Sequence, residues 1–226
     1  MLTGIAASGG FATGKILCLK HQKPVYSPLL FRGEKEETRR LERATAQFCY
    51  NMEQSVASLR RIVGVEEAEI FHGHSLIAHD AEFQAEMRQR IYWGLNAETA
   101  AETTADMYIA RFLEADSAMT RGRAADIKDV KNALLRLLCE QAQEMPIVPF
   151  GSVIVARELT PSAVRFLERR RTVAIVTEKG DRNTHLAILA RAMGIPAVMS
   201  VKGLMQIVHS GQQVIVDGNK GEVILI

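Results

Sequence analysis

The 226 residues include 28 Lys and Arg against 26 Asp and Glu, a formal charge of +2 that lacks the positive excess of a nucleic-acid binder. The hydrophobic fraction of 47% is enough to bury a core. No apolar run approaches the roughly 20 residues that span a bilayer, and no signal-peptide pattern opens the chain, so we expect a cytoplasmic protein without membrane contact. Cys18, Cys49 and Cys139 are widely spaced in apolar surroundings, which indicates core residues rather than disulfides or metal ligands.

The first 33 residues combine glycines with short apolar runs. Residues 15–19 follow a glycine-rich entry and are mostly apolar, which predicts a strand. Residues 21–33 contain Pro24, Pro28 and Gly33 and are typical of a connecting segment.

From Glu34 onward the apolar residues recur every three or four positions, as they do on one face of a helix. This pattern predicts four helices, near residues 34–63, 66–93, 97–115 and 123–144. Because the joints between them are short, we expect an antiparallel four-helix bundle.

After Pro146 and Pro149 the pattern changes to short β-branched strands that alternate with helical runs. The predicted strands are 152–156, 172–176, 213–216 and 222–226, the predicted helices are 162–170 and 185–193, and residues 218–221 form a hairpin turn. The helical pattern of the middle of the chain and the alternating strands and helices after it indicate two domains. We expect an α/β domain made of residues 1–20 and 146–226, interrupted by an all-α subdomain of residues 21–145.

His185 lies in the first turn of the predicted helix, directly after a strand and a polar turn. The first N–H groups of a helix have no internal partners and carry a partial positive charge, which stabilises an anion. Imidazole is a nucleophile near neutral pH. Arg182 and Arg191 are candidate cations for a phosphoryl group on the ring, and Arg182 is the better placed.

Residues beside His185 fit the same chemistry. Thr184 or Asn183 could cap the helix or bond a phosphoryl oxygen, and Gly180 allows a backbone conformation closed to other residues. A histidine at the start of a helix is, however, more often a surface or capping residue. These local features therefore permit a phosphohistidine without requiring one.

The stretch GDRNTHLAILARAMGIPAV, residues 180–198, resembles the phosphohistidine signature shared by enzyme I of the bacterial phosphoenolpyruvate-dependent sugar phosphotransferase system, pyruvate phosphate dikinase and phosphoenolpyruvate synthase. Four further stretches resemble enzyme I in particular and occur in its order: GIAASGGFATGK, EAEIFHGHSLIAHDAEF, RAADIKDVKNALLR and VIVARELTPS. The likeness runs from residue 2 to the end of the chain, and it corresponds to the N-terminal half of enzyme I, which binds the carrier HPr and holds the phosphohistidine.

The resemblance implies an α/β phosphohistidine, or swivelling, domain with an inserted all-α four-helix bundle subdomain that docks HPr. It implies that His185 takes a phosphoryl group from phosphoenolpyruvate on Nε2 and passes it to the active histidine of HPr. Thr160 matches a threonine that bonds this histidine, and it is equally a helix cap before Pro161. The implied catalytic set is His185, Thr160, Arg182, Thr184 and Gly180.

Three residues depart from the signature. Asp181 stands where the family has a glycine, Asn183 replaces a threonine and Thr184 replaces a serine. A carboxylate near a phosphoryl dianion would repel it unless Asp181 points away or pairs with Arg182. The altered turn favours the alternative of a non-catalytic docking or regulatory module.

The resemblance also implies a docking surface for HPr on the helical part. An apolar centre with a charged rim suits such a contact, although the apolar residues alone fit a bundle core equally well. Gly73 lies within the segment and could kink the helix. The implied contact residues are His74, Leu76, Ile77, Asp80, Glu82, Phe83, Met119 and Arg123. His72 and His74 point to different sides of a helix, so we predict no metal site.

Enzyme I also has a barrel domain that binds phosphoenolpyruvate and magnesium and forms the dimer, and no stretch here resembles it. We therefore expect no cofactor in this chain, magnesium only in that C-terminal domain, and a monomer. The expected partners are HPr or an HPr-like carrier and the phosphoenolpyruvate-binding domain. By itself the chain should exchange phosphate with a phosphorylated carrier and fail to react with phosphoenolpyruvate. A second alternative is the equivalent region of a multidomain phosphotransferase that uses another carrier.

Overall fold

The computed structural model describes residues 1–19, 24–60, 65–140, 147–159 and 171–226. Two compact units make up the chain. One contains residues 1–22, 57–68 and 145–226, and the other contains residues 23–56 and 69–144. Among the described residues, no helix is both long and apolar enough to cross a membrane.

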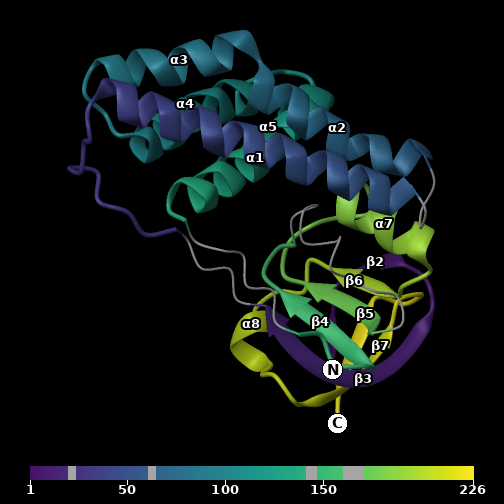
Figure 1. The fold of residues 1–226 in the computed structure, drawn as a ribbon. Coiled ribbons are helices and arrows are strands. Elements are labelled where there is room, and N and C mark those ends of the chain that lie inside the picture. Colours follow the sequence, from purple (N-terminus) through teal and green to yellow (C-terminus); the bar gives the residue numbers. More distant parts are fainter. Residues whose placement is uncertain (20–23, 61–64, 141–146, 160–170) are drawn as a thin grey trace. The chain divides into compact units, whose positions relative to one another are not determined.

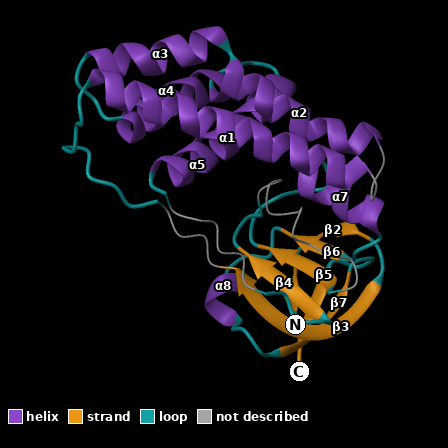
Figure 2. Cartoon of the chain, in the orientation of Figure 1, coloured by secondary structure: helices purple, strands orange, loops and turns teal. Residues whose placement is uncertain are grey.

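The first unit is built on a curved eight-stranded sheet, drawn in orange in Figure 2. Its order is β1-β8-β7-β3-β4-β5-β6-β2. Neighbouring strands from β3 to β6 run parallel, and the remaining pairs are antiparallel. The strands are β1 (Leu2–Thr3), β2 (Ile5–Ser8), β3 (Phe11–Leu19), β4 (Ser152–Ala156), β5 (Thr172–Thr177), β6 (Ala197–Met199), β7 (Gln213–Asp217) and β8 (Glu222–Leu225).

The sheet closes on itself at Gly4. β1 and β2 stand at opposite ends of the strand order, yet only this residue separates them in the chain, so the two ends must meet. The Gly4 N–H donates to the oxygen of Gly221 at 2.9 Å. A Cβ here would lie 2.4 Å from the oxygen of Met199, which leaves room for glycine alone.

Alternate residues of the strands, together with three residues of the segment 201–208, form an apolar core, as expected for strand side chains with a period of two. The buried members of this cluster are Ile16, Val153, Val155, Ala174, Val176, Val198, Val201, Leu204, Val208, Val214, Val216 and Val223. Among the described residues from 147 to 226, the helices are α7 (His185–Met193) and α8 (Leu204–Ile207), and α7 contacts β2 (Figure 1). The helix predicted for 162–170 lies outside the described residues.

The described residues between 34 and 138 form five helices where four were predicted: α1 (Glu34–Arg60), α2 (Val65–His79), α3 (Ala81–Tyr92), α4 (Ala97–Leu113) and α5 (Ala118–Leu138). The predicted helix 66–93 is divided at Asp80, and Gly73 lies inside α2 without breaking it. The Asp80 carboxylate accepts a hydrogen bond from the Phe83 N–H at 2.8 Å and so caps α3. α4 packs against both α3 and α5.

The predicted α/β fold with a helical insertion is confirmed. Strands predicted at 152–156, 172–176, 213–216 and 222–226 are present within one residue at each end, and the strand predicted at 15–19 begins earlier, at Phe11. β1, β2, β6 and α8 were not predicted.

Candidate functional site

β5 leads through residues 178–184 into α7, whose first residue is His185. Thr184 is the N-cap residue, with φ −66° and ψ 150°, and Gly194 ends the helix in the left-handed region. The predicted helix 185–193 is confirmed. His185 is half-buried at the open end of this helix. The side chains that face the interior are Leu186, Ala187, Leu189, Ala190 and Met193.

Gly180 is required by the backbone of this loop. Its φ is +109°, a region that other residues rarely adopt, and a Cβ would lie 3.1 Å from Met199 Sδ. The Ser200 hydroxyl donates to the Gly180 oxygen at 2.5 Å. The loop is therefore fixed at its start by β6 and the residue after it.

Asp181 directs its carboxylate into its own loop. Oδ1 accepts a hydrogen bond from the Asn183 N–H at 2.7 Å. Arg182 does not pair with it: its Nε donates instead to the main-chain oxygen of Ala6 at 2.9 Å. Of the two arrangements that would limit repulsion of a phosphoryl group, pairing with Arg182 is not formed, and the carboxylate is hydrogen-bonded within its own loop instead.

The Thr184 side chain does not cap α7. Its hydroxyl donates to the main-chain oxygen of Asp181 at 2.8 Å and lies 3.4 Å from Met199 Sδ. The N–H groups of the first turn therefore donate no hydrogen bond to the N-cap side chain. Such groups, together with the helix dipole, favour an anion at this end.

The two arginines have different surroundings. Arg191 Nη1 donates to the oxygens of Ala7 at 2.8 Å and Arg182 at 2.9 Å, so it braces the loop against β2. Arg182 is exposed, and in the described part of the chain its side chain forms only the Nε bond to Ala6. Its terminal guanidinium nitrogens are therefore available to an anionic group. Thr160, the fifth predicted catalytic residue, lies outside the described residues.

The α2–α3 junction brings together four of the predicted docking residues. Leu76, Asp80 and Glu82 are exposed, with Leu76 at 60%, and Ile77 is half-buried. Phe83 differs, because it is only 3% exposed and packs edge-on against Tyr108 with ring centroids 5.4 Å apart. Its side chain is a core residue of the helical unit in this structure.

His74 and Arg123 converge on an acidic residue that the prediction did not single out. His74 Nε2 lies 3.8 Å from Asp126 Oδ1 and 3.9 Å from Asp129 Oδ2, and Arg123 Nη1 lies 3.7 Å from Asp126 Oδ2. Asp126 and Asp129 belong to the RAADIKDVKNALLR stretch, so the resemblance of that stretch to enzyme I could have pointed to these two residues. Met119 lies in α5, and the position of its side chain is not described.

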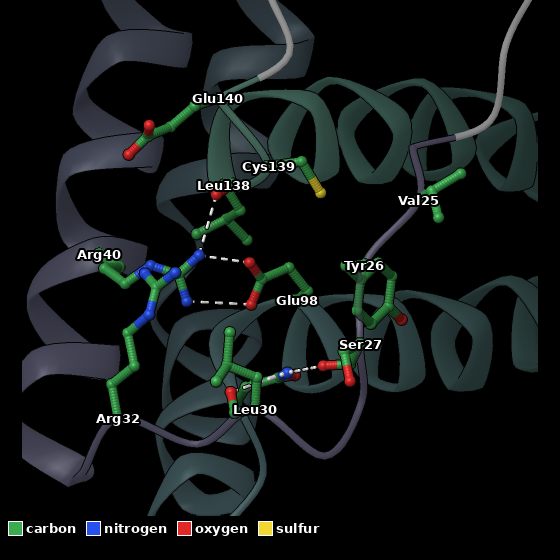
Figure 3. A pocket seen from close by; sticks show the side chains of 11 residues that line it. Val25, Tyr26, Ser27, Leu30, Arg32, Arg40, Glu98, Leu138, Cys139 and Glu140 are labelled. Atoms are coloured by element: carbon green, nitrogen blue, oxygen red, sulfur yellow. Dashed lines mark hydrogen bonds and ion pairs between the residues drawn. The ribbon is translucent and has the colours of Figure 1, made fainter.

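A separate cavity of about 220 Å³ lies in the helical unit (Figure 3). The guanidinium group of Arg40 is already paired: it binds Glu37 and Glu98 and donates to the Leu138 oxygen at 2.9 Å. This arrangement ties α1, α4 and α5 together and gives the cavity a structural role. The cavity is lined by Val25, Tyr26, Ser27, Leu30, Arg32, Arg40, Asn96, Glu98, Leu138, Cys139 and Glu140.

Two family descriptions match the chain. "PEP-utilising enzyme, N-terminal" matches residues 3–123, and "PEP-utilising enzyme, mobile domain" matches residues 148–221, which include the loop and His185. The chain therefore belongs to the PEP-utilising enzymes, and within them it corresponds to the N-terminal region of Enzyme I, the phosphoenolpyruvate-protein phosphotransferase.

Curated relatives support the narrower assignment. The chain is 35% identical over 226 residues to the phosphoenolpyruvate-protein phosphotransferase of Priestia megaterium, which covers 99% of this chain and 39% of the relative. It is 32% identical to the enzyme of the same name from Bacillus subtilis strain 168, again over 99% of this chain and 40% of the relative. The chain thus spans about two fifths of these proteins.

Solved structures show the same fold. A solution structure of Enzyme I superposes with a TM-score of 0.77 at 28% identity, covering 100% of this chain and 92% of that one. The N-terminal domain of Enzyme 1 - Nitrogen gives a TM-score of 0.68 at 25% identity, covering 100% and 93%. The expected family and fold are confirmed.

Proposed function

We propose that this chain carries a phosphoryl group on Nε2 of His185 and exchanges it with a small histidine-phosphorylated carrier of the HPr type. One observation carries the proposal: His185 opens a helix whose first turn lacks a side-chain cap from Thr184, three residues after the exposed Arg182. The names of the curated relatives point to the same chemistry.

The transfer balances without a further reactant. The lone pair on Nε2 of His185 attacks phosphorus, the bond from phosphorus to the carrier's imidazole nitrogen breaks, and its electron pair stays on that imidazole. His185 releases its ring proton and the carrier imidazole takes one up. The reverse step returns the phosphoryl group, so the chain acts as a relay.

Two features of the site stabilise the phosphorylated form. An anion at a helix N-terminus gains roughly 0.3–2 kcal/mol from the dipole and the free N–H groups. The terminal nitrogens of Arg182 can add charge-assisted hydrogen bonds to phosphoryl oxygens. Gly180 and Thr184 shape the loop that presents both groups. Thr160 completes the proposed set through the family resemblance.

We further propose that residues 21–145 dock the carrier and that residues 1–20 and 146–226 hold the phosphohistidine. Leu76 and Ile77 supply an apolar centre at the α2–α3 junction, and Asp80 and Glu82 supply a charged rim. Arg123 and Met119 complete the proposed contact, while His74 and Phe83, each 3% exposed, support it from the interior.

Binding of phosphoenolpyruvate is assigned to a C-terminal domain of the full-length protein. That domain would bind phosphoenolpyruvate with magnesium and pass the phosphoryl group to His185 in the cytoplasm. The 226 residues alone should be monomeric and should take phosphate from the phosphorylated carrier but not from phosphoenolpyruvate.

The test uses HPr carrying radiolabelled phosphate on its histidine. The chain should acquire an acid-labile label, and the His185→Ala variant should acquire none. His209→Ala removes an exposed histidine away from the loop and serves as the matched control, because it should label like the unaltered chain. Phosphoenolpyruvate alone forms a second arm and should give no label.

Persistent labelling of His185→Ala would overturn the assignment of the phosphorylated residue. Carrier binding by calorimetry without any label would instead identify a docking or regulatory module. Labelling by a different phosphocarrier, but not by HPr, would identify the equivalent region of another multidomain phosphotransferase.

A further inference from the structure

The loop before α7 is closed by hydrogen bonds to both the side chain and the main chain of Asp181. Oδ1 accepts from the Asn183 N–H at 2.7 Å, and the main-chain oxygen accepts from the Thr184 hydroxyl at 2.8 Å. Asp commonly imitates a turn in this way. All three positions that depart from the family signature take part in these bonds: Asp181 and Thr184 contribute their side chains, and Asn183 contributes its main-chain N–H.

The turn closed by the Asp181 carboxylate holds the residue whose main-chain oxygen binds the Thr184 hydroxyl. A threonine at an N-cap normally accepts a hydrogen bond from an N–H of the first helical turn. Here its hydroxyl donates to Asp181 and lies 3.4 Å from Met199 Sδ, and it caps nothing. The hydrogen bond to Asp181 thus draws the hydroxyl away from the end of the helix on which His185 stands.

The surrounding contacts hold the rest of the loop independently of this turn. Ser200 fixes the oxygen of Gly180, and Arg191 fixes the oxygen of Arg182 at 2.9 Å. The loss of the Asp181 carboxylate should therefore change the loop locally without unfolding the sheet unit.

We infer that Asp181 is a positioning residue for the phosphohistidine: its turn keeps Thr184 from capping α7 and leaves the first N–H groups to a phosphoryl group on His185. The inference rests on the proposed function. It assigns the effect to the hydrogen-bond acceptor Oδ1, and the negative charge of the carboxylate plays no part in it.

Two substitutions separate these properties. Asp181→Asn keeps the acceptor oxygen and removes the charge, whereas Asp181→Ala removes both. The rate of phosphate exchange with labelled HPr should fall roughly threefold to tenfold in Asp181→Ala, as expected for one hydrogen bond. Asp181→Asn should restore most of that rate. Half-saturation by HPr should stay the same in both variants, because the loop acts on the transferred group.

A second readout reports on the turn itself. Hydrogen exchange of the Asn183 N–H, followed by NMR without any carrier, should be slow in the unaltered chain and in Asp181→Asn and faster in Asp181→Ala. Exchange of the buried strand amides of β4 and β5 should be unchanged in all three and shows that each variant is folded.

The outcomes distinguish the two proposals. If the unaltered chain takes no label, the function of His185 fails and the role of Asp181 falls with it. If the unaltered chain is labelled and Asp181→Ala exchanges phosphate at the same rate, only the role of Asp181 is overturned. If Asp181→Asn is as slow as Asp181→Ala while its Asn183 N–H stays protected, the charge and not the turn is responsible, which also overturns the inference.

Discussion

The Arg191 guanidinium donates to the main-chain oxygen of Arg182 at 2.9 Å, and the same nitrogen donates to Ala7 at 2.8 Å. One side chain near the end of α7 therefore holds both the loop before the helix and the edge strand β2. Because the acceptors are main-chain oxygens, Arg191 fixes the geometry of the loop and leaves Arg182 to meet an anion.

Replacement of Arg191 by Met should remove both bonds while keeping most of the apolar stem. We expect a loss of about 1.5–3 kcal/mol in the free energy of unfolding, as for hydrogen bonds from a charged donor. Urea unfolding measures the change. Arg88→Met is the control, because Arg88 is 3.9 Å from Glu42 and both are exposed, so its loss should change stability by less than about 0.5 kcal/mol. Equal stabilities for the two variants would contradict the bracing role.

Gly180→Ala should destabilise the chain by roughly 1–3 kcal/mol, because alanine is strained at a φ of +109°. The contact of 3.1 Å to Met199 Sδ adds to this cost. Gly122→Ala provides the opposite case: it lies inside α5 with open space around it, so alanine should stabilise by about 0.5–1 kcal/mol. Thermal unfolding of the two variants should shift in opposite directions, and a shift in the same direction would refute the backbone argument.

Local sequence signals were sufficient for the helix that carries the site. The apolar period from Leu186 to Met193 and the glycine at position 194 predicted α7 at its observed bounds, because each signal acts within a few residues. The division between α2 and α3 was missed, because the capping role of Asp80 lay inside a longer helical pattern.

Strand pairings between residues distant in the chain could not be predicted from the sequence. Leu2 pairs with Val223 at the other end of the chain, and Ile5 pairs with Met199, so no local pattern marks these short strands. The burial of Phe83 in the predicted docking segment also depends on a residue distant in sequence. An apolar residue on a helix fits a docking surface or a core equally well, and only its packing against Tyr108 decides between them.

Acid should weaken the helical unit through Glu37. Burial alone raises the pKa of this carboxyl, but hydrogen bonds from the N–H groups of Ala97 and Arg32 and from Arg40 outweigh it and hold the pKa below 4.5. A depressed pKa in the folded state means that its contribution to stability is complete above pH 4.5 and is lost as the pH falls through the folded value. Glu37→Gln should therefore show a smaller loss of stability between pH 5 and roughly pH 3 in urea unfolding.

The half-exposed neighbour Glu36 supplies the control for that experiment. Its side chain is 39% accessible and pairs with Arg39 on the surface, so Glu36→Gln should keep the acid dependence of the unaltered chain. An unchanged acid profile in Glu37→Gln would assign the acid sensitivity to other groups.

At neutral pH, Arg40→Met should lower the free energy of unfolding by about 3–5 kcal/mol, because it leaves Glu37 and Glu98 buried without their cation.

Leu76 and Phe83 should separate docking from folding at the α2–α3 junction. Leu76 is 60% exposed, so Leu76→Ala should change the free energy of unfolding by less than about 0.5 kcal/mol. Phe83 is 3% exposed, and Phe83→Ala should cost about 3–5 kcal/mol through the cavity that it leaves beside Tyr108.

Leu76→Ala, which should hardly change stability, should have a clear effect on binding of the carrier. If Leu76 lies at the centre of the carrier contact, its truncation should weaken binding of HPr in calorimetry by about 1–2 kcal/mol, roughly fivefold to thirtyfold in Kd. Tyr92→Ala is the matched control, because Tyr92 is 69% exposed at the far end of α3 and belongs to no proposed contact. Normal HPr binding by Leu76→Ala, with its fold intact, would place the docking surface elsewhere, because a truncated anchor cannot leave its own interface unchanged.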